Sequence, residues 1–193
     1  ARNGTPNALY MNRGDGTFAE EAVQRGADDS RWTFAAAVAD HDLDGDLDLY
    51  LANDYGDNAL LVNDGTGHFH DVAADAGVLD TGNGMAAAWG DVDNDARLDL
   101  YVANMSSTAG KRILGRLVPQ DDSGLGAKLV KLAGGNSIFR VDDDGGFERI
   151  PAEHGGVGAS WAWSSAFLDV DLDADLDVFV ANGFVTGETA ADT

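Results

Sequence analysis

The sequence predicts an all-β protein built from four-stranded antiparallel units of the kind that form the blades of a β-propeller. Two observations predict this class. A nine-residue motif with Asp at alternate positions begins at residues 40, 91 and 169, and each copy is followed by an apolar run. A segment of constant length from Asn to Phe begins at residues 7, 58 and 136, so both markers repeat with separations of 51 and 78 residues. A repeat of about 50 residues with four short strands is typical of a propeller blade.

The first two strands of each unit flank the acidic motif. The strand before it alternates larger with small residues and is rich in Ala at residues 35–37 and 86–88, which suits an innermost strand at a crowded axis. The strand after it is nearly identical in the three copies, at residues 47–53, 98–104 and 176–182. Branched and aromatic residues in a short run that ends in Asn indicate a strand followed by a turn.

The third and fourth strands form a hairpin. The third begins at the Asn of the marker, and the fourth surrounds the Phe that lies 11 residues later. Residues 14–16 and 63–65 lie between them and favour a tight turn, because Gly accepts a positive φ. The adhesion tripeptide Arg13-Gly14-Asp15 falls at this turn, and we interpret it as turn chemistry.

These units divide the chain into blades and half-blades. We expect the last two strands of one blade at residues 1–27, a complete blade at 32–78, a second complete blade at 83–157 with an insertion at 105–135, and the first two strands of another at 160–185. A propeller closes with about four to eight blades, so we expect a segment of a larger propeller of about seven blades. The open blade edges offer surfaces for pairing.

The acidic motif carries the chemistry of the chain. Clustered carboxylates repel one another unless they surround a hard cation, and Ca²⁺ accepts about six to eight oxygen ligands from such a loop. An EF-hand would need Glu at position 12, where this chain has Leu51, Val102 and Val180. We therefore predict up to three calcium ions, held at positions 1, 3, 5 and 9 by Asp40, Asp42, Asp44, Asp48, Asp91, Asp93, Asp95, Asp99, Asp169, Asp171, Asp173 and Asp177.

At these residues the chain resembles the FG-GAP/VCBS repeat family, whose calcium-loaded blades also occur in integrin α-subunit propellers. The family pattern is a strand that ends in Phe-Gly, then Asp-x-Asp-x-Asp-Gly-x-x-Asp and an apolar strand. Trp89-Gly90 is similar to the Phe-Gly end, whereas Val38-Ala39 and Phe167-Leu168 depart from it. The resemblance implies that position 7 adds a backbone carbonyl ligand, here from Asp46, Arg97 and Asp175.

Two of the loops lack the family's glycine at position 6. Ala96 and Ala174 stand there instead, in a place that usually adopts a left-handed conformation, where Ala costs about 1 kcal/mol. We therefore expect these loops to bind calcium more weakly than the loop at Asp40. Residues 101–107 and 180–184 are similar to the subgroup that carries a C-terminal ASPIC/UnbV domain, which includes the cartilage acidic proteins.

The composition argues against several classes of partner. The chain has 34 acidic and 12 basic residues and a net charge of −22, so it would repel the phosphates of a nucleic acid. It has no cysteine and no apolar run long enough to span a membrane. The family resemblance implies a location outside the cell, on its surface or in the periplasm.

The insertion at residues 105–135 is the predicted partner surface. It links the second and third strands of a blade, so it should emerge at the end opposite the acidic loops. A long loop on a rigid scaffold is a usual place for binding, and a basic rim beside apolar residues favours an acidic partner. The insertion holds five of the twelve basic residues, namely Lys111, Arg112, Arg116, Lys128 and Lys131.

Three functions remain open from the sequence. The one we favour is a non-catalytic, calcium-stabilised propeller that binds a protein or a glycan. The second is a structural subunit of an extracellular filament or larger complex, joined through the insertion or the open blade edges. The third is part of a propeller enzyme that acts on polysaccharides, although the chain shows no nucleophile elbow, triad motif or zinc motif.

Overall fold

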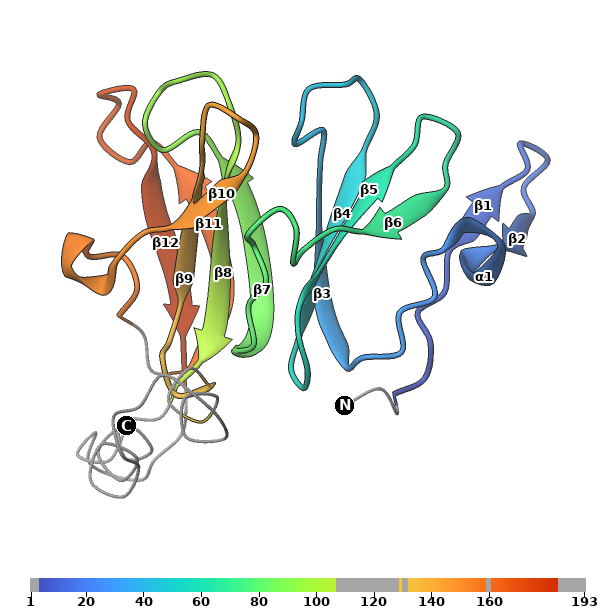
Figure 1. Cartoon of the computed structure of the whole chain (residues 1–193), viewed down its shortest axis with the longest axis horizontal. Helices are drawn as coiled ribbons and strands as arrows, with labels where there is room; N and C mark the ends of the chain where they lie inside the picture. Colours follow the sequence, from blue (N-terminus) through green and yellow to red (C-terminus); the bar gives the residue numbers. More distant parts are fainter. Residues whose placement is uncertain (1–3, 107–128, 130–131, 159–160, 184–193) are drawn as a thin grey trace.

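A computed structural model describes residues 4–106, 129, 132–158 and 161–183. In this part the chain forms two four-stranded and two two-stranded sheets that stand side by side (Figure 1). The helical segments α1 (Ala22–Arg25) and η1 (Ala152–His154) are each a single turn, and no helix among the described residues is long and apolar enough to cross a membrane. The structure confirms the all-β class and its four-stranded antiparallel blades.

Each complete blade is a meander in which strands pair in chain order. The first blade contains β3 (Thr33–Ala39), β4 (Asp48–Asn53), β5 (Ala59–Asn63) and β6 (Phe69–Asp71). The second contains β7 (Asn83–Gly90), β8 (Asp99–Met105), β9 (Ser137–Val141) and β10 (Phe147–Arg149). On either side lie the hairpins β1 (Tyr10–Asn12) with β2 (Phe18–Glu20), and β11 (Ala162–Leu168) with β12 (Asp177–Asn182).

The strand register places the three acidic loops at equivalent positions. Each loop is closed by a strand pair at its base, and these pairs are Ala39 with Asp48, Gly90 with Asp99, and Leu168 with Asp177. The register also shifts at the same point of each first strand, at Phe34, Met85 and Trp163. The loops therefore lie together at one end of the sheets, at the top of Figure 1, while β8 ends and β9 begins at the opposite end.

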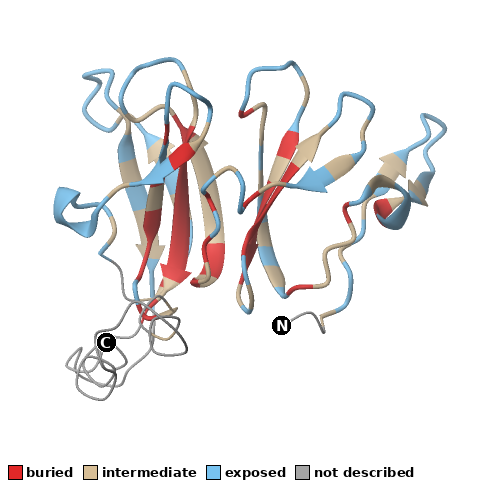
Figure 2. Cartoon of the chain, in the orientation of Figure 1, coloured by how far each residue is buried: buried red, intermediate tan, exposed pale blue. Residues whose placement is uncertain are grey.

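The core lies between the sheets, because successive residues of a strand point to opposite faces. On β8, Leu100 and Val102 pack with Tyr50 of the first complete blade. The alternate residues Tyr101 and Ala103 pack toward β11 and β12. Figure 2 shows the buried residues concentrated in these middle strands. Neighbouring blades thus bury each other's faces, as they do in a propeller.

The innermost strands approach one another closely. β7 lies beside both β3 and β11, and the rings of Phe34 on β3 and Trp163 on β11 have centroids 6.4 Å apart. A Cβ at Gly90 would strike the ring of Phe167, so this contact requires a small residue. On β3 the packed face holds Ala35, Ala37 and Ala39. The alternate residues Phe34, Ala36 and Val38 are exposed, with Phe34 and Val38 at 55% and 54%.

In the first two connections between blades, a glycine contacts the backbone of the next blade. Gly77, with φ +84°, lies against the backbone of Phe147, whose N–H donates a hydrogen bond of 2.8 Å to the carbonyl of Ala76. Gly26, with φ +73°, meets the backbone of Phe69 in the same way. A side chain at either position would strike a carbonyl oxygen, so glycine is needed for space as well as for conformation.

The repeated Asn residues form a buried clamp in each complete blade. The backbone N–H of Asn53 donates to Oδ1 of Asn58 at 2.7 Å, and Nδ2 of Asn58 donates to the hydroxyl of Tyr50 at 3.2 Å. The second complete blade repeats both bonds, at 2.8 and 2.6 Å, through Asn104, Asn136 and Tyr101. The marker Asn of the sequence is therefore a structural residue that ties the second strand to the third.

Candidate metal centre

The three acidic loops share one backbone conformation. Positions 4 and 6 both have a positive φ in every loop, with values of 61° and 98° at Leu43 and Gly45, 61° and 69° at Asn94 and Ala96, and 63° and 75° at Leu172 and Ala174. The two alanines therefore adopt the left-handed conformation expected for glycine, although their side chains disfavour it. Contacts within each loop must impose this conformation.

The carboxylate at position 1 provides that contact. In each loop it accepts a hydrogen bond from the backbone N–H at position 6. The three bonds measure 3.1, 2.8 and 3.0 Å and join Gly45 to Asp40, Ala96 to Asp91, and Ala174 to Asp169. This bond turns the loop inward and brings the carboxylates that follow close to the first one.

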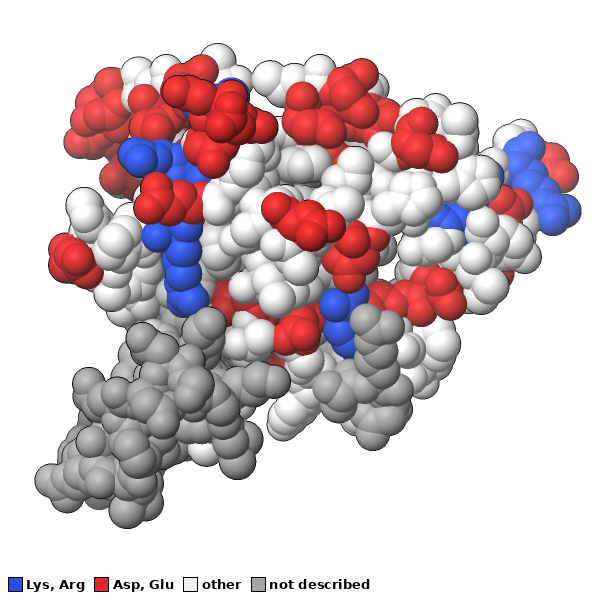
Figure 3. All heavy atoms as spheres, viewed as in Figure 1, with Lys and Arg blue, Asp and Glu red and all other residues white. Residues whose placement is uncertain are grey.

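The carboxylates at positions 1, 3 and 5 converge in the first and third loops. One oxygen from each of these acids lies within 4.8 Å of the others, in the sets Asp40, Asp42, Asp44 and Asp169, Asp171, Asp173. In the second loop the converging set is Asp91, Asp93 and Asp99, from which Asp95 is absent. Figure 3 shows the acidic side chains gathered at this end of the molecule.

The first loop contains oxygen atoms that no protein group satisfies. Oδ1 of Asp40 and Oδ1 of Asp46 are buried and have no hydrogen-bond donor. Burial and the charges of Asp44 and other acids of the loop raise the pKa of Asp46. Leaving carboxylate oxygens buried without a partner is costly, and calcium is a cation that oxygen ligands of this kind satisfy. The residues present therefore fit a calcium ion.

The carboxylate at position 9 braces the loop against the neighbouring strand. Oδ1 of Asp48 accepts the N–H of Asn63 at 2.8 Å, and Oδ2 lies 2.6 Å from Nδ1 of His41. The His41 ring in turn stacks on Phe147, with centroids 6.1 Å apart. Burial raises the pKa of the equivalent Asp99 in the second loop. Sequence reasoning assigned no role to His41, and its stacking partner Phe147 lies in the following blade, where only the packing of two blades brings it close.

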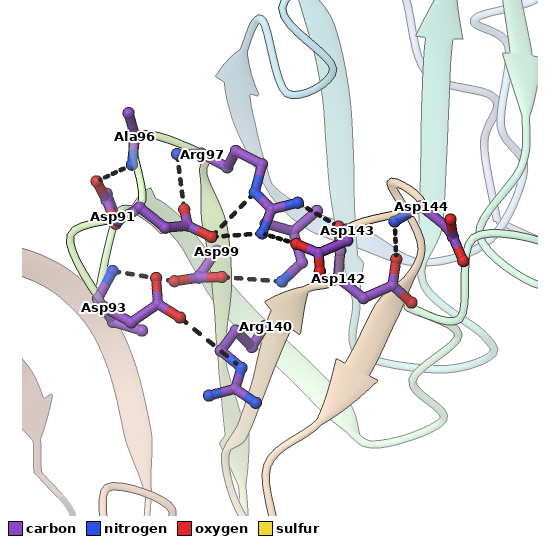
Figure 4. Close-up of polar contacts among 12 residues, drawn as sticks. Asp91, Asp93, Ala96, Arg97, Asp99, Arg140, Asp142, Asp143 and Asp144 are labelled. Atoms are coloured by element: carbon purple, nitrogen blue, oxygen red, sulfur yellow. Dashed lines mark hydrogen bonds and ion pairs between the residues drawn. The ribbon is translucent and has the colours of Figure 1, made fainter.

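The second loop differs from the others because it contains arginine. Arg97 at position 7, labelled in Figure 4, binds Asp95 through Nε at 2.9 Å and Nη2 at 2.6 Å. This hydrogen bond from Arg97 is the main reason that the pKa of Asp95 is lowered. Arg140 of β9 places Nε 3.9 Å from Oδ2 of Asp93. Two predicted ligands of this loop therefore face guanidinium groups.

Sequence reasoning did not identify Arg140 or Asp143 as part of this site. Asp143 lies in the turn between β9 and β10, where it receives a hydrogen bond of 3.2 Å from Arg97. The sequence did contain a signal for Asp143. The turn at residues 142–144 consists of three acids, whereas the equivalent turn of the preceding blade contains Asn63-Asp64-Gly65, so the extra acids could have indicated a cationic partner. The predicted partner residues Lys111, Arg112, Arg116, Lys128 and Lys131 lie outside the described residues.

The fold and the loops define a class of protein: an all-β repeat protein whose blades each carry an acidic loop between the first two strands. The chain belongs to the FG-GAP-like repeat family, which matches residues 1–51 and 40–102. This confirms the family predicted from the acidic motif and its flanking strands.

The chain is also similar to curated proteins named cartilage acidic protein 1. It is 31% identical to the human protein over 184 residues, which covers 92% of this chain and 24% of the relative. It is 30% identical to the mouse protein over 184 residues, with 92% and 25% covered, and 31% identical to the Xenopus tropicalis protein over 105 residues, with 52% and 16% covered. The chain thus spans about a quarter or less of these relatives, and the matches confirm the predicted subgroup.

Proposed function

We propose that this chain is a non-catalytic β-propeller segment in which calcium stabilises the blades and whose surface binds a protein or a glycan. The observation that carries this is that the carboxylates at positions 1, 3 and 5 converge in the first and third loops, and that Oδ1 of Asp40 in the first loop is buried without a hydrogen-bond donor. Such a loop combines backbone strain with mutual repulsion of carboxylates. A bound divalent cation supplies the opposite charge that offsets the repulsion.

Within this proposal the residues of the first loop have distinct roles. Asp40, Asp42 and Asp44 hold the ion together with the carbonyl of Asp46. Asp48 contributes by fixing the loop to Asn63 of β5, and it retains lone pairs for the ion. The third loop is proposed to act in the same way through Asp169, Asp171, Asp173, Asp175 and Asp177. The ion would thereby join the first strand of a blade to the second at their shared end.

We further propose that more blades of the same kind pack on both open faces. Tyr50 and Tyr101 are fully buried between blades, whereas Phe179 at the equivalent place on β12 is 62% exposed. Phe18, the counterpart of the buried Phe147, is 60% exposed. Gly155 has the same positive φ as the glycines that receive a blade, and no described atom lies within 4 Å of its Cβ position.

A location outside the cell follows from the same proposal. Two named features of the relatives, cartilage and acidity, suit an extracellular chain with a net charge of −22. Calcium modules of the extracellular space bind with dissociation constants of about 10⁻⁴ to 10⁻³ M. An affinity this weak suits the third loop, which has Ala174 at position 6. The partner class and the role of the basic insertion remain predictions.

The experiment is thermal unfolding with calcium, with magnesium and with excess chelator. Calcium should raise the melting temperature, because a ligand that binds only the folded state stabilises it by mass action. Magnesium should restore little of this stability, since it prefers rigid octahedral sites. The double variant Asp42→Asn/Asp44→Asn should lose most of the calcium response, and the exposed Asp75→Asn serves as a control of equal charge change per residue. A melting curve that chelator leaves unchanged would contradict the proposal.

A further inference from the structure

We propose that Arg97 closes the second acidic loop in place of a cation, so that the chain binds two calcium ions, in the loops at Asp40 and Asp169, instead of three. This inference rests on the proposed function. It means that the second loop keeps its shape without a bound metal ion, whereas the first and third loops hold calcium.

Arg97 occupies the position 5 carboxylate that a calcium ion would need. Its Nε and Nη2 atoms lie 2.9 and 2.6 Å from Oδ2 of Asp95. Its Nη1 donates a hydrogen bond of 2.6 Å to the backbone carbonyl of Asp142, which anchors the guanidinium group from the other side (Figure 4). Asp95 consequently does not join the converging set of this loop, whereas the position 5 acids Asp44 and Asp173 join theirs.

The other acids of the second loop also have partners. Asp93 faces Arg140 at 3.9 Å. Asp99 accepts the backbone N–H groups of Val92 and Val141, each at 2.9 Å. In contrast, the first loop leaves Oδ1 of Asp40 and Oδ1 of Asp46 buried and unpaired.

The surroundings of position 7 change together with the residue itself. In the first complete blade Asp46 stands at position 7 and faces Gly65 of the neighbouring turn, where an added Cβ would lie 3.4 Å from Oδ2 of Asp46. In the second complete blade Arg97 stands there, and the counterpart of Gly65 is Asp143, which pairs with Arg97 at 3.2 Å. The blade that has Arg97 in place of Asp46 therefore also has an acid, Asp143, in place of Gly65.

The charges explain why this arrangement disfavours calcium. The first and third loops each carry five carboxylates, whereas the second carries four and an arginine. A divalent cation at the second loop would be repelled by the guanidinium groups of Arg97 and Arg140, and it would have to displace Arg97 from Asp95. Among the described residues, every ion pair of Arg with an acid of the three loops belongs to the second loop.

The second loop in turn supports the third. Nδ2 of Asn94 donates a hydrogen bond of 2.6 Å to Oδ1 of Asp175, at position 7 of the third loop. A loop that Arg97 holds closed keeps Asn94 in place whether or not calcium is present. The arginine-closed loop is therefore a fixed brace for its calcium-binding neighbour.

Calcium stoichiometry tests the inference, measured by equilibrium dialysis and by calorimetric titration of the whole chain. The unaltered chain should bind two ions. The variant Arg97→Asp/Asp143→Gly, which reproduces the surroundings of Asp46, should bind a third. Arg13→Gln, which makes the same net charge change on an exposed turn, should still bind two. Asp91→Asn should also leave two, and Asp171→Asn should leave one.

The measured number of calcium ions distinguishes a failure of this inference from a failure of the proposed function. Three ions in the unaltered chain, or a fall to one ion in Asp91→Asn, would overturn the inference and leave the proposed function standing. A folded double variant that still binds only two ions would also overturn it. Binding of no ion by the unaltered chain would instead contradict the proposed function itself. Circular dichroism of each variant establishes that it is folded.

Discussion

The hydroxyl group of Tyr50 donates a hydrogen bond of 3.1 Å to the backbone carbonyl of Val78, in the connection that leads to the next blade. Tyr101 repeats this bond at 2.8 Å with the carbonyl of Gly156. Burial raises the pKa of both tyrosines above the ordinary value, so each stays a neutral donor. The repeated tyrosine therefore links each middle strand to the segment that enters the following blade.

Replacing Tyr50 with Phe should destabilise the fold. The change leaves the carbonyl of Val78 and Nδ2 of Asn58 without their partner in a buried place, at a cost of about 1–3 kcal/mol. Chemical denaturation in calcium measures the free energy of unfolding. The exposed Tyr55→Phe should change it by less than about 0.5 kcal/mol, and equal effects of the two substitutions would show that the hydrogen bond is unimportant.

Replacing Arg31 with Ala should be more damaging. Arg31 binds Asp29 at 2.8 Å and Asp71 at 2.7 Å, and the side chains of Arg31 and Asp29 are only 9% and 7% exposed. Removing the cation leaves a buried charge unpaired, which costs about 3–5 kcal/mol at neutral pH. The exposed Arg13→Ala provides the control. A similar small effect of both variants on the unfolding free energy would contradict the prediction.

The Arg31 effect should also depend on pH. Burial alone would raise the pKa of Asp29, but the hydrogen bonds and charge of Arg31 outweigh it, so the pKa is lowered. A group with a lower pKa when folded stabilises the protein above its unfolded pKa of about 3.9 and loses this effect as pH falls through its folded pKa. The stability difference between the unaltered chain and Arg31→Ala should therefore shrink between pH 7 and pH 3. A constant difference would exclude this linkage.

Replacing Gly77 with Ala tests the close approach of two blades. The new Cβ would strike the carbonyl oxygen of Phe147, which should cost about 1–3 kcal/mol from overpacking in addition to about 1 kcal/mol from the positive φ. Gly14 has a similar φ of +79° with no atom within 4 Å of the added Cβ, so Gly14→Ala should incur only the backbone cost. Equal losses of melting temperature in the two variants would contradict the packing argument.

Replacing Ala174 with Gly should improve the third loop. Ala174 has a φ of 75°, and glycine removes a strain of about 1 kcal/mol, so both stability and calcium affinity should rise. The reverse change, Gly45→Ala in the first loop, should lower both by a similar amount. Calcium titration of the two variants measures this. Unchanged affinity in both would mean that position 6 does not influence the loop.

Local pattern was enough to predict the all-β class, the repeat and the positions of the acidic loops. Strand alternation, glycine turns and the spacing of Asp residues act over a few neighbouring residues, so they can be read directly along the chain. The left-handed conformation at position 6 was predictable for the same reason, and it holds even where Ala96 and Ala174 replace glycine. The same pattern did not indicate that position 4 is left-handed as well, because Leu43 and Leu172 carry no such signal.

Tertiary structure decided how the equivalent loops differ. Arg97 meets Asp143 from a turn 46 residues later, and Asn94 meets Asp175 from a loop 81 residues later. His41 finds Asp48 within its own loop but stacks on Phe147 of the following blade. Such contacts form only when blades pack face to face, since a charge acts on whatever group lies near it in space. The sequence by itself determined where carboxylates cluster, and packing determined which clusters a protein cation already satisfies.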